Sequence, residues 1–107
     1  MTFQPTHDEE RGPARGPAVP VLSQHELFGV PGFVTHDRDG RGILAEGGGL
    51  ALSHAETGML VVYGRTIPDL LRLADSKIRG RARVLGKSDI AAFVQERINW
   101  ARQKVAA

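Results

Sequence analysis

The 107-residue chain contains no cysteine, and none of its apolar runs reaches the length of a membrane span. The absence of cysteine excludes disulfides, thiolate metal ligands and cysteine nucleophiles, and it fits a reducing compartment. The first five residues, Met1 to Pro5, also lack the basic and apolar regions of a secretory signal peptide. These absences predict a cytoplasmic protein that has no membrane partner.

Recognisable catalytic patterns are lacking as well. Ser53 and His54 are neighbours on a predicted strand, so their side chains point to opposite faces and cannot act together as nucleophile and base. The histidines show no metal-ligand spacing in the sequence. A metal site that combines His36, Asp37 or Asp39, and His54 from different strands of the sheet stays open. The sequence therefore predicts no catalytic residue, no metal and no cofactor, and it favours a protein that is not an enzyme.

The first 24 residues differ in composition from the rest of the chain. They contain four of the six prolines and the acidic run Asp8 to Glu10, with few side chains that could fill a core. Such a composition is typical of a disordered tail. The sequence therefore predicts a tail over residues 1–24 and a single small domain over residues 25–107.

From residue 26 on, short apolar runs alternate with turn signals, which is typical of antiparallel strands. One predicted hairpin turns at 37–40 and returns along 43–45, because Asp-Gly accepts the backbone angles of a tight turn. A second hairpin joins 50–54 to 59–63. The run 59–63 is apolar on both faces, as expected of a central strand or of a strand at a subunit contact.

The stretch from Val62 to Val105 carries one pattern twice: an apolar strand end, a glycine, a cation, a hydroxyl residue and then helical spacing. The first copy predicts a helix over 67–79, capped by Thr66 and ended by Gly80. The second predicts a helix over 89–105, capped by Ser88. Residues 81–85, between the helices, are predicted to form a short strand.

This order of elements predicts an α+β fold, in which an antiparallel sheet of N-terminal β-hairpins is followed by helix, strand and helix. Both helices are predicted to lie on one face of the sheet. A domain of about 80 residues buries little more than about 60% of its unfolded surface. The small core therefore favours a homodimer that shares core surface.

Charge is distributed unevenly along the chain. Residues 1–64 carry 4 basic and 8 acidic side chains, whereas residues 65–107 carry 10 basic and 4 acidic ones. An excess of cations in one half indicates a nucleic acid or an acidic protein as the partner. On the predicted strand Arg81 and Arg83 would share one face, and on the last helix rings and cations alternate along a ridge that begins at Phe93.

Two functions follow from these observations. The first is a small accessory or regulatory protein that binds nucleic acid, DNA rather than RNA, because phosphates attract cations and bases stack on rings. The second is a homo-oligomeric interaction or adaptor module, indicated by the small core and by the strand 59–63. The predicted nucleic-acid contacts are Lys77, Arg79, Arg81, Arg83, Lys87, Arg97, Trp100 and Lys104.

Overall fold

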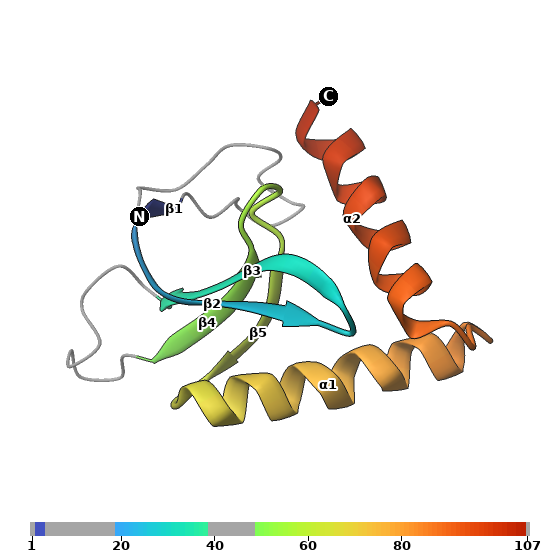
Figure 1. Ribbon diagram of the computed structural model, residues 1–107, viewed down its shortest axis with the longest axis horizontal. Helices are drawn as coiled ribbons and strands as arrows, with labels where there is room; N and C mark the ends of the chain where they lie inside the picture. The colour runs from blue at the N-terminus through green and yellow to red at the C-terminus, as the bar shows by residue number, and fades with distance from the viewer. Residues whose placement is uncertain (1, 4–18, 39–48, 107) are drawn as a thin grey trace.

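The computed structural model describes residues 2–3, 19–38 and 49–106, and it confirms the α+β fold (Figure 1). The strands precede the helices along the chain. The elements are β1 (Thr2–Phe3), β2 (Val19–Leu27), β3 (Val30–Asp37), β4 (Leu50–His54), β5 (Leu60–Gly64), α1 (Ile67–Val84) and α2 (Ile90–Ala106).

The strands form one sheet in the order β1-β2-β3-β4-β5, and each strand is antiparallel to its neighbours. The predicted hairpin of 50–54 with 59–63 is confirmed by the pairing of β4 with β5. The return strand predicted at 43–45 lies outside the described residues. Strands β1 and β2 contain residues 2–3 and 19–24 of the predicted tail, so these residues belong to the sheet, while residues 4–18 lie outside the description.

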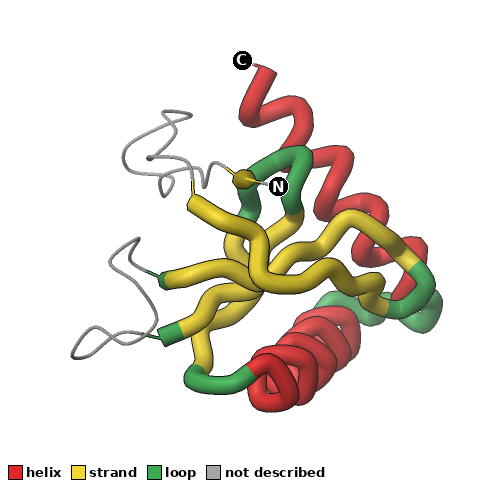
Figure 2. The backbone as a smooth tube through the Cα atoms, turned by 60° about the vertical axis from the view of Figure 1, so that its left-hand side comes forward, coloured by secondary structure: helices red, strands yellow, loops and turns green. Residues whose placement is uncertain are grey.

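The core is built jointly by the sheet and both helices. Phe33 and Leu52 from the strands are almost completely buried, together with Leu70 of α1 and Ile98 of α2. Figure 2 shows α1 packed along the sheet, with α2 leading away from its end at a large angle. Side chains of both helices thus share one hydrophobic cluster with the strands, while their placement on a single face of the sheet stays a prediction.

The short strand predicted at 81–85 is wrong, because α1 continues through Gly80 to Val84. Gly80 does not have a positive φ, and nothing lies within 4 Å of the position where a Cβ would be. The glycine that ends the helix is Gly86, whose φ is 70°. Ala82 is fully buried as predicted, but Val84 is 80% exposed instead of facing the core.

One pair of substitutions tests this assignment of the two glycines. Gly80→Ala should stabilise the protein by about 0.5–1 kcal/mol, because alanine loses less backbone entropy inside a helix. Gly86→Ala should destabilise it by about 1 kcal/mol, because an L-residue is strained at positive φ. Urea unfolding of the two variants measures both effects. A destabilised Gly80→Ala variant would instead support a helix end at Gly80.

The caps of the two helices differ from each other. Thr66 caps α1 as predicted, since its hydroxyl accepts a hydrogen bond from the Asp69 backbone N–H at 3.2 Å. The predicted Ser88 cap of α2 is wrong. Asp89 takes that place, because its carboxylate accepts from the Ala92 N–H at 3.1 Å and its carbonyl accepts from the Phe93 N–H. Serine and aspartate are both common N-cap residues, and Asp89 is the cap here because it directly precedes the first residue of α2.

Candidate interaction surfaces

Strand β5 is the outermost strand of the described sheet on its side, although its side chains are apolar on both faces. Leu60 is 40% exposed and Tyr63 is 46% exposed, while Val61 is buried. An outer strand usually carries charges or a covering segment that prevent further strand pairing. A strand that is apolar on both faces usually lies inside a sheet or at a subunit contact. Within the described residues, β5 instead lies at the edge.

The backbone of β5 also turns hydrogen-bonding groups away from the sheet. Along an antiparallel strand, alternate residues direct their N–H and C=O groups to opposite neighbours. The bond from the Arg38 N–H to the Gly49 carbonyl fixes this alternation for β4 and places Leu52 among the residues that face β5. Val62, the partner of Leu52, therefore directs its backbone N–H and C=O groups toward β4. The next residue, Tyr63, directs its own N–H and C=O groups away from the sheet.

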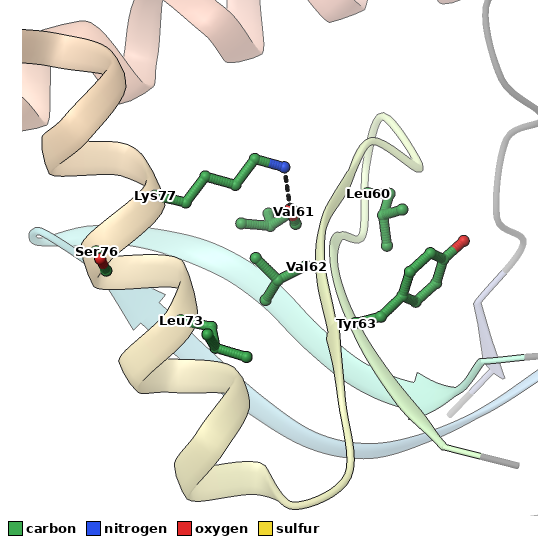
Figure 3. A pocket seen from close by; sticks show the side chains of 7 residues that line it. All are labelled: Leu60, Val61, Val62, Tyr63, Leu73, Ser76 and Lys77. Atoms are coloured by element: carbon green, nitrogen blue, oxygen red, sulfur yellow. Dashed lines mark hydrogen bonds between the residues drawn. The ribbon is translucent and has the colours of Figure 1, made fainter.

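An open groove runs between β5 and α1 (Figure 3). Its lining includes Val62 of the strand and Leu73 of the helix, which is 38% exposed. Lys77 spans the groove, and its Nζ donates a hydrogen bond to the Val61 carbonyl at 2.6 Å. Leu60 and Tyr63 point to the other side of the strand, where the Arg38 guanidinium lies 4.2 Å from the centre of the tyrosine ring.

Five cations of the predicted nucleic-acid surface lie on or directly after α1, Lys77 among them, and they do not share one face. Successive residues of a helix are separated by about 100°, so Arg81 and Arg83 point to nearly opposite sides of it. Arg79 pairs with Asp75 of the same helix at 2.9 Å. Lys87, just beyond the helix, lies 3.4 Å from Glu96. The shared face predicted for Arg81 and Arg83 depended on a strand and is wrong.

Three of the four residues of the predicted ridge on α2 lie together. The guanidinium of Arg97 lies 4.5 Å from the centre of the Trp100 ring, and the ammonium of Lys104 lies 5.4 Å from it. These three residues follow one another at helical spacing, whereas Phe93, which begins the ridge in the sequence, is buried. The structure thus brings together three of the eight predicted contacts in one cluster, here called the Trp100 ridge.

A buried histidine and serine pair was not predicted from the sequence. His36 donates from Nδ1 to the Asp37 carbonyl at 2.9 Å, so its Nε2 accepts from the Ser53 hydroxyl at 2.9 Å. This resembles a nucleophile with its base. However, Ser53 is only 1% exposed and His36 only 3%, so no substrate reaches the hydroxyl. The pair serves to satisfy polar groups inside the sheet.

His54 is the second buried histidine. It makes a hydrogen bond with the Thr57 hydroxyl at 3.0 Å and packs edge-on against Phe33. The pairing register places His36 opposite Ala51, and Phe33 opposite His54, so the two histidines lie on opposite faces of the sheet. No metal-binding cluster occurs among the described residues. His36 and His54 therefore cannot share the cross-sheet metal site that the sequence left open.

No family model, curated protein or solved structure matches this chain. In addition, no helix of the described residues is long and apolar enough to cross a membrane.

The two buried histidines predict a loss of stability in mild acid. Burial lowers the pKa of His36 and of His54 below the ordinary value of 6.5. Since the unfolded chain then binds protons first, the stabilisation is complete above about pH 6.5 and is lost as pH falls toward the lowered values. Urea unfolding between pH 7.5 and pH 5 should show a falling free energy of unfolding, with a smaller slope in His54→Gln. If the free energy of unfolding fell with the same slope in His54→Gln as in the wild type, the contribution of His54 would be contradicted.

Proposed function

We propose that the protein is a homo-oligomeric interaction module, in which β5 of one copy pairs with β5 of a second copy. The observation that supports this is the position of a strand that is apolar on both faces at the outside of the described sheet. Pairing would cover Leu60 and Tyr63 and extend the sheet from one copy into the other. The outward backbone groups at Tyr63 would then gain partners.

A second copy fits this edge because an antiparallel strand can pair with itself across a twofold axis. In such an isologous contact each side supplies the same apolar residues and the same outward N–H and C=O groups. Main-chain hydrogen bonds would contribute affinity, and the side chains at positions 60 and 63 would contribute buried apolar area. A domain with so small a core also gains stability when it shares apolar surface.

Lys77 opposes this pairing in the single chain. Its ammonium donates a hydrogen bond to the Val61 carbonyl, which lies along the β5 edge. A dimer would bring two such ammonium groups near the shared strands. Charged lysines commonly protect sheet edges from association. In this proposal Lys77 limits the affinity of the dimer.

Replacing Lys77 tests that role. Lys77→Met should tighten the dimer by roughly tenfold, because it frees an acceptor and removes like charge at the interface. The dissociation constant is measured by sedimentation equilibrium in low salt. Ser76→Met, a change on the neighbouring residue of the groove, provides the control and should have less effect. A weaker dimer in Lys77→Met would show that the lysine supports the contact.

The oligomeric state tests the proposed function itself. Sedimentation of the full chain over a range of micromolar concentrations should give a reversible equilibrium between monomer and dimer. Amide hydrogen exchange should show that protection of Tyr63 increases with protein concentration. A strict monomer throughout that range would contradict the proposal.

Nucleic-acid binding is the second candidate, and the observation that favours it is the Trp100 ridge. Two cations beside one partly exposed indole suit a phosphate backbone together with a stacked base. Fluorescence anisotropy with single-stranded and duplex DNA in low salt should detect binding, and Trp100→Ala should weaken it. With about two phosphate contacts, the logarithm of affinity should fall with the logarithm of salt at a slope of about −1.5 to −2. Absence of binding to either DNA would contradict this candidate.

A further inference from the structure

The corner between α1 and α2 presents the two most exposed large hydrophobic residues in the described part of the chain. Val84 is 80% exposed and Leu85 is 52% exposed. Figure 1 shows that the two helices meet at one end of the molecule. The pair therefore lies at a projecting tip, apart from the β5 edge and from the Trp100 ridge.

The backbone holds this tip in a fixed conformation. The Lys87 N–H donates to the Ala82 carbonyl at 2.8 Å, and the Gly86 N–H donates to the Arg83 carbonyl at 3.1 Å. Together with the positive φ of Gly86, these bonds form a Schellman motif. Such motifs often cover an apolar residue of the last turn with the residue that follows the glycine. Here those two positions are Lys87 and Ala82, so the contact does not involve Val84 or Leu85, which are exposed.

Cations surround the apolar tip. Arg81 and Arg83 belong to the last turn of α1, and Lys87 follows Gly86. Arg81 and Arg83 are exposed, and no carboxylate lies within 4.0 Å of either side-chain charge among the described residues. Because the two arginines point to different sides of the helix, they cannot both line one narrow groove. Both arginines can, however, contact a flat surface against which the tip is placed.

We infer that this corner docks on an anionic lipid surface, with Val84 and Leu85 entering the interface and the cations contacting the headgroups. Apolar insertion and electrostatic attraction together give reversible surface binding without a spanning helix. A nucleic acid would use the cations but would gain little from the aliphatic pair. The inference departs from the sequence-based prediction of no membrane partner, which depended on the absence of a spanning segment.

Vesicle binding tests the inference, and the absence of cysteine makes site-specific labelling simple. Val84→Cys, labelled with a polarity-sensitive fluorophore, should brighten and shift to the blue with vesicles of phosphatidylcholine and phosphatidylserine. Vesicles of phosphatidylcholine alone should give little change, and added salt should reverse the signal. Gln103→Cys on the exposed surface of α2 should report no polarity change. Equal signals at positions 84 and 103 would overturn the proposed orientation.

Unlabelled variants separate the two contributions. In vesicle sedimentation, the double variant Val84→Ser and Leu85→Ser should bind roughly 30-fold more weakly. The double variant Arg81→Gln and Arg83→Gln should bind the vesicles roughly 20-fold more weakly. Leu22→Ser, which changes an exposed leucine of β2, should bind as the wild type does. Circular dichroism checks that each variant folds.

Two results would overturn the inference. One is the absence of wild-type binding to phosphatidylserine vesicles in low salt. The other is an unaffected Val84→Ser and Leu85→Ser variant combined with binding of an oligonucleotide that Arg81→Gln and Arg83→Gln abolish. That second result would assign the corner cations to a nucleic acid.

Discussion

The double variant Leu60→Lys and Tyr63→Lys should be monomeric at concentrations where the wild type is a dimer. Each dimer would lose apolar contacts from both copies and would gain four like charges along the shared strands. Like-charge juxtaposition at an interface costs several kcal/mol, so the dissociation constant should rise by at least roughly 100-fold. Sedimentation equilibrium of the double variant and the wild type measures the change.

Leu22 provides a matched control for this prediction. It is an exposed leucine on a strand of the same sheet, and its exposed fraction of 41% nearly equals the 40% of Leu60. Leu22→Lys should leave the dimer intact because β2 is not the paired edge. If Leu22→Lys also dissociated the dimer, or if the double variant still dimerised, the β5 interface would be excluded.

Leu70→Ala should destabilise the protein by about 3 kcal/mol, within a usual range of about 2–5 kcal/mol for buried leucines. Leu70 has no exposed surface and lies in the cluster shared by the strands and both helices. Its position is also tight, since a Cβ built on Gly64 would lie 3.0 Å from Leu70 Cδ2. The residue thus joins the end of β5 to the first turns of α1.

Leu73 is the control for that substitution, because it lies one turn further along the same helix but is 38% exposed. Leu73→Ala should cost less than about 1 kcal/mol, because alanine also has the higher helix propensity. Chemical denaturation of both variants gives the comparison. Equal losses would contradict the assignment of Leu70 to the core and Leu73 to the groove.

Local signals predicted the elements that depend on neighbouring residues. Thr66 lies at the N-cap of α1, and the apolar spacing of Leu70 and Ala74 marks the buried side of that helix. The prediction failed at Gly80, because glycine is compatible with a helix end and, at a modest cost, with a helix interior. The hydrogen bonds that continue the helix to Val84 outweigh that cost, and Gly86 supplies the positive φ that ends it.

The functional surfaces depended more on long-range pairing. Arg97, Trp100 and Lys104 were predicted as a cluster because helical spacing alone brings them together. The contact of His36 with Ser53 was missed, since it requires the register between two strands. The run 59–63 was correctly identified as apolar on both faces, but the same pattern fits a central strand, and only the strand order places it at an edge.

A distance between spin labels tests the β5 interface most directly. Neighbouring strands of a sheet are about 4.8 Å apart, so labels at Tyr63→Cys in two copies should lie on adjacent strands and interact strongly. Labels at Leu22→Cys should be separated by seven strand spacings, about 34 Å. A short distance at position 63 with a long one at position 22 is the predicted result. A dimer with the opposite order of distances, or no dipolar interaction at either position, would contradict pairing through β5.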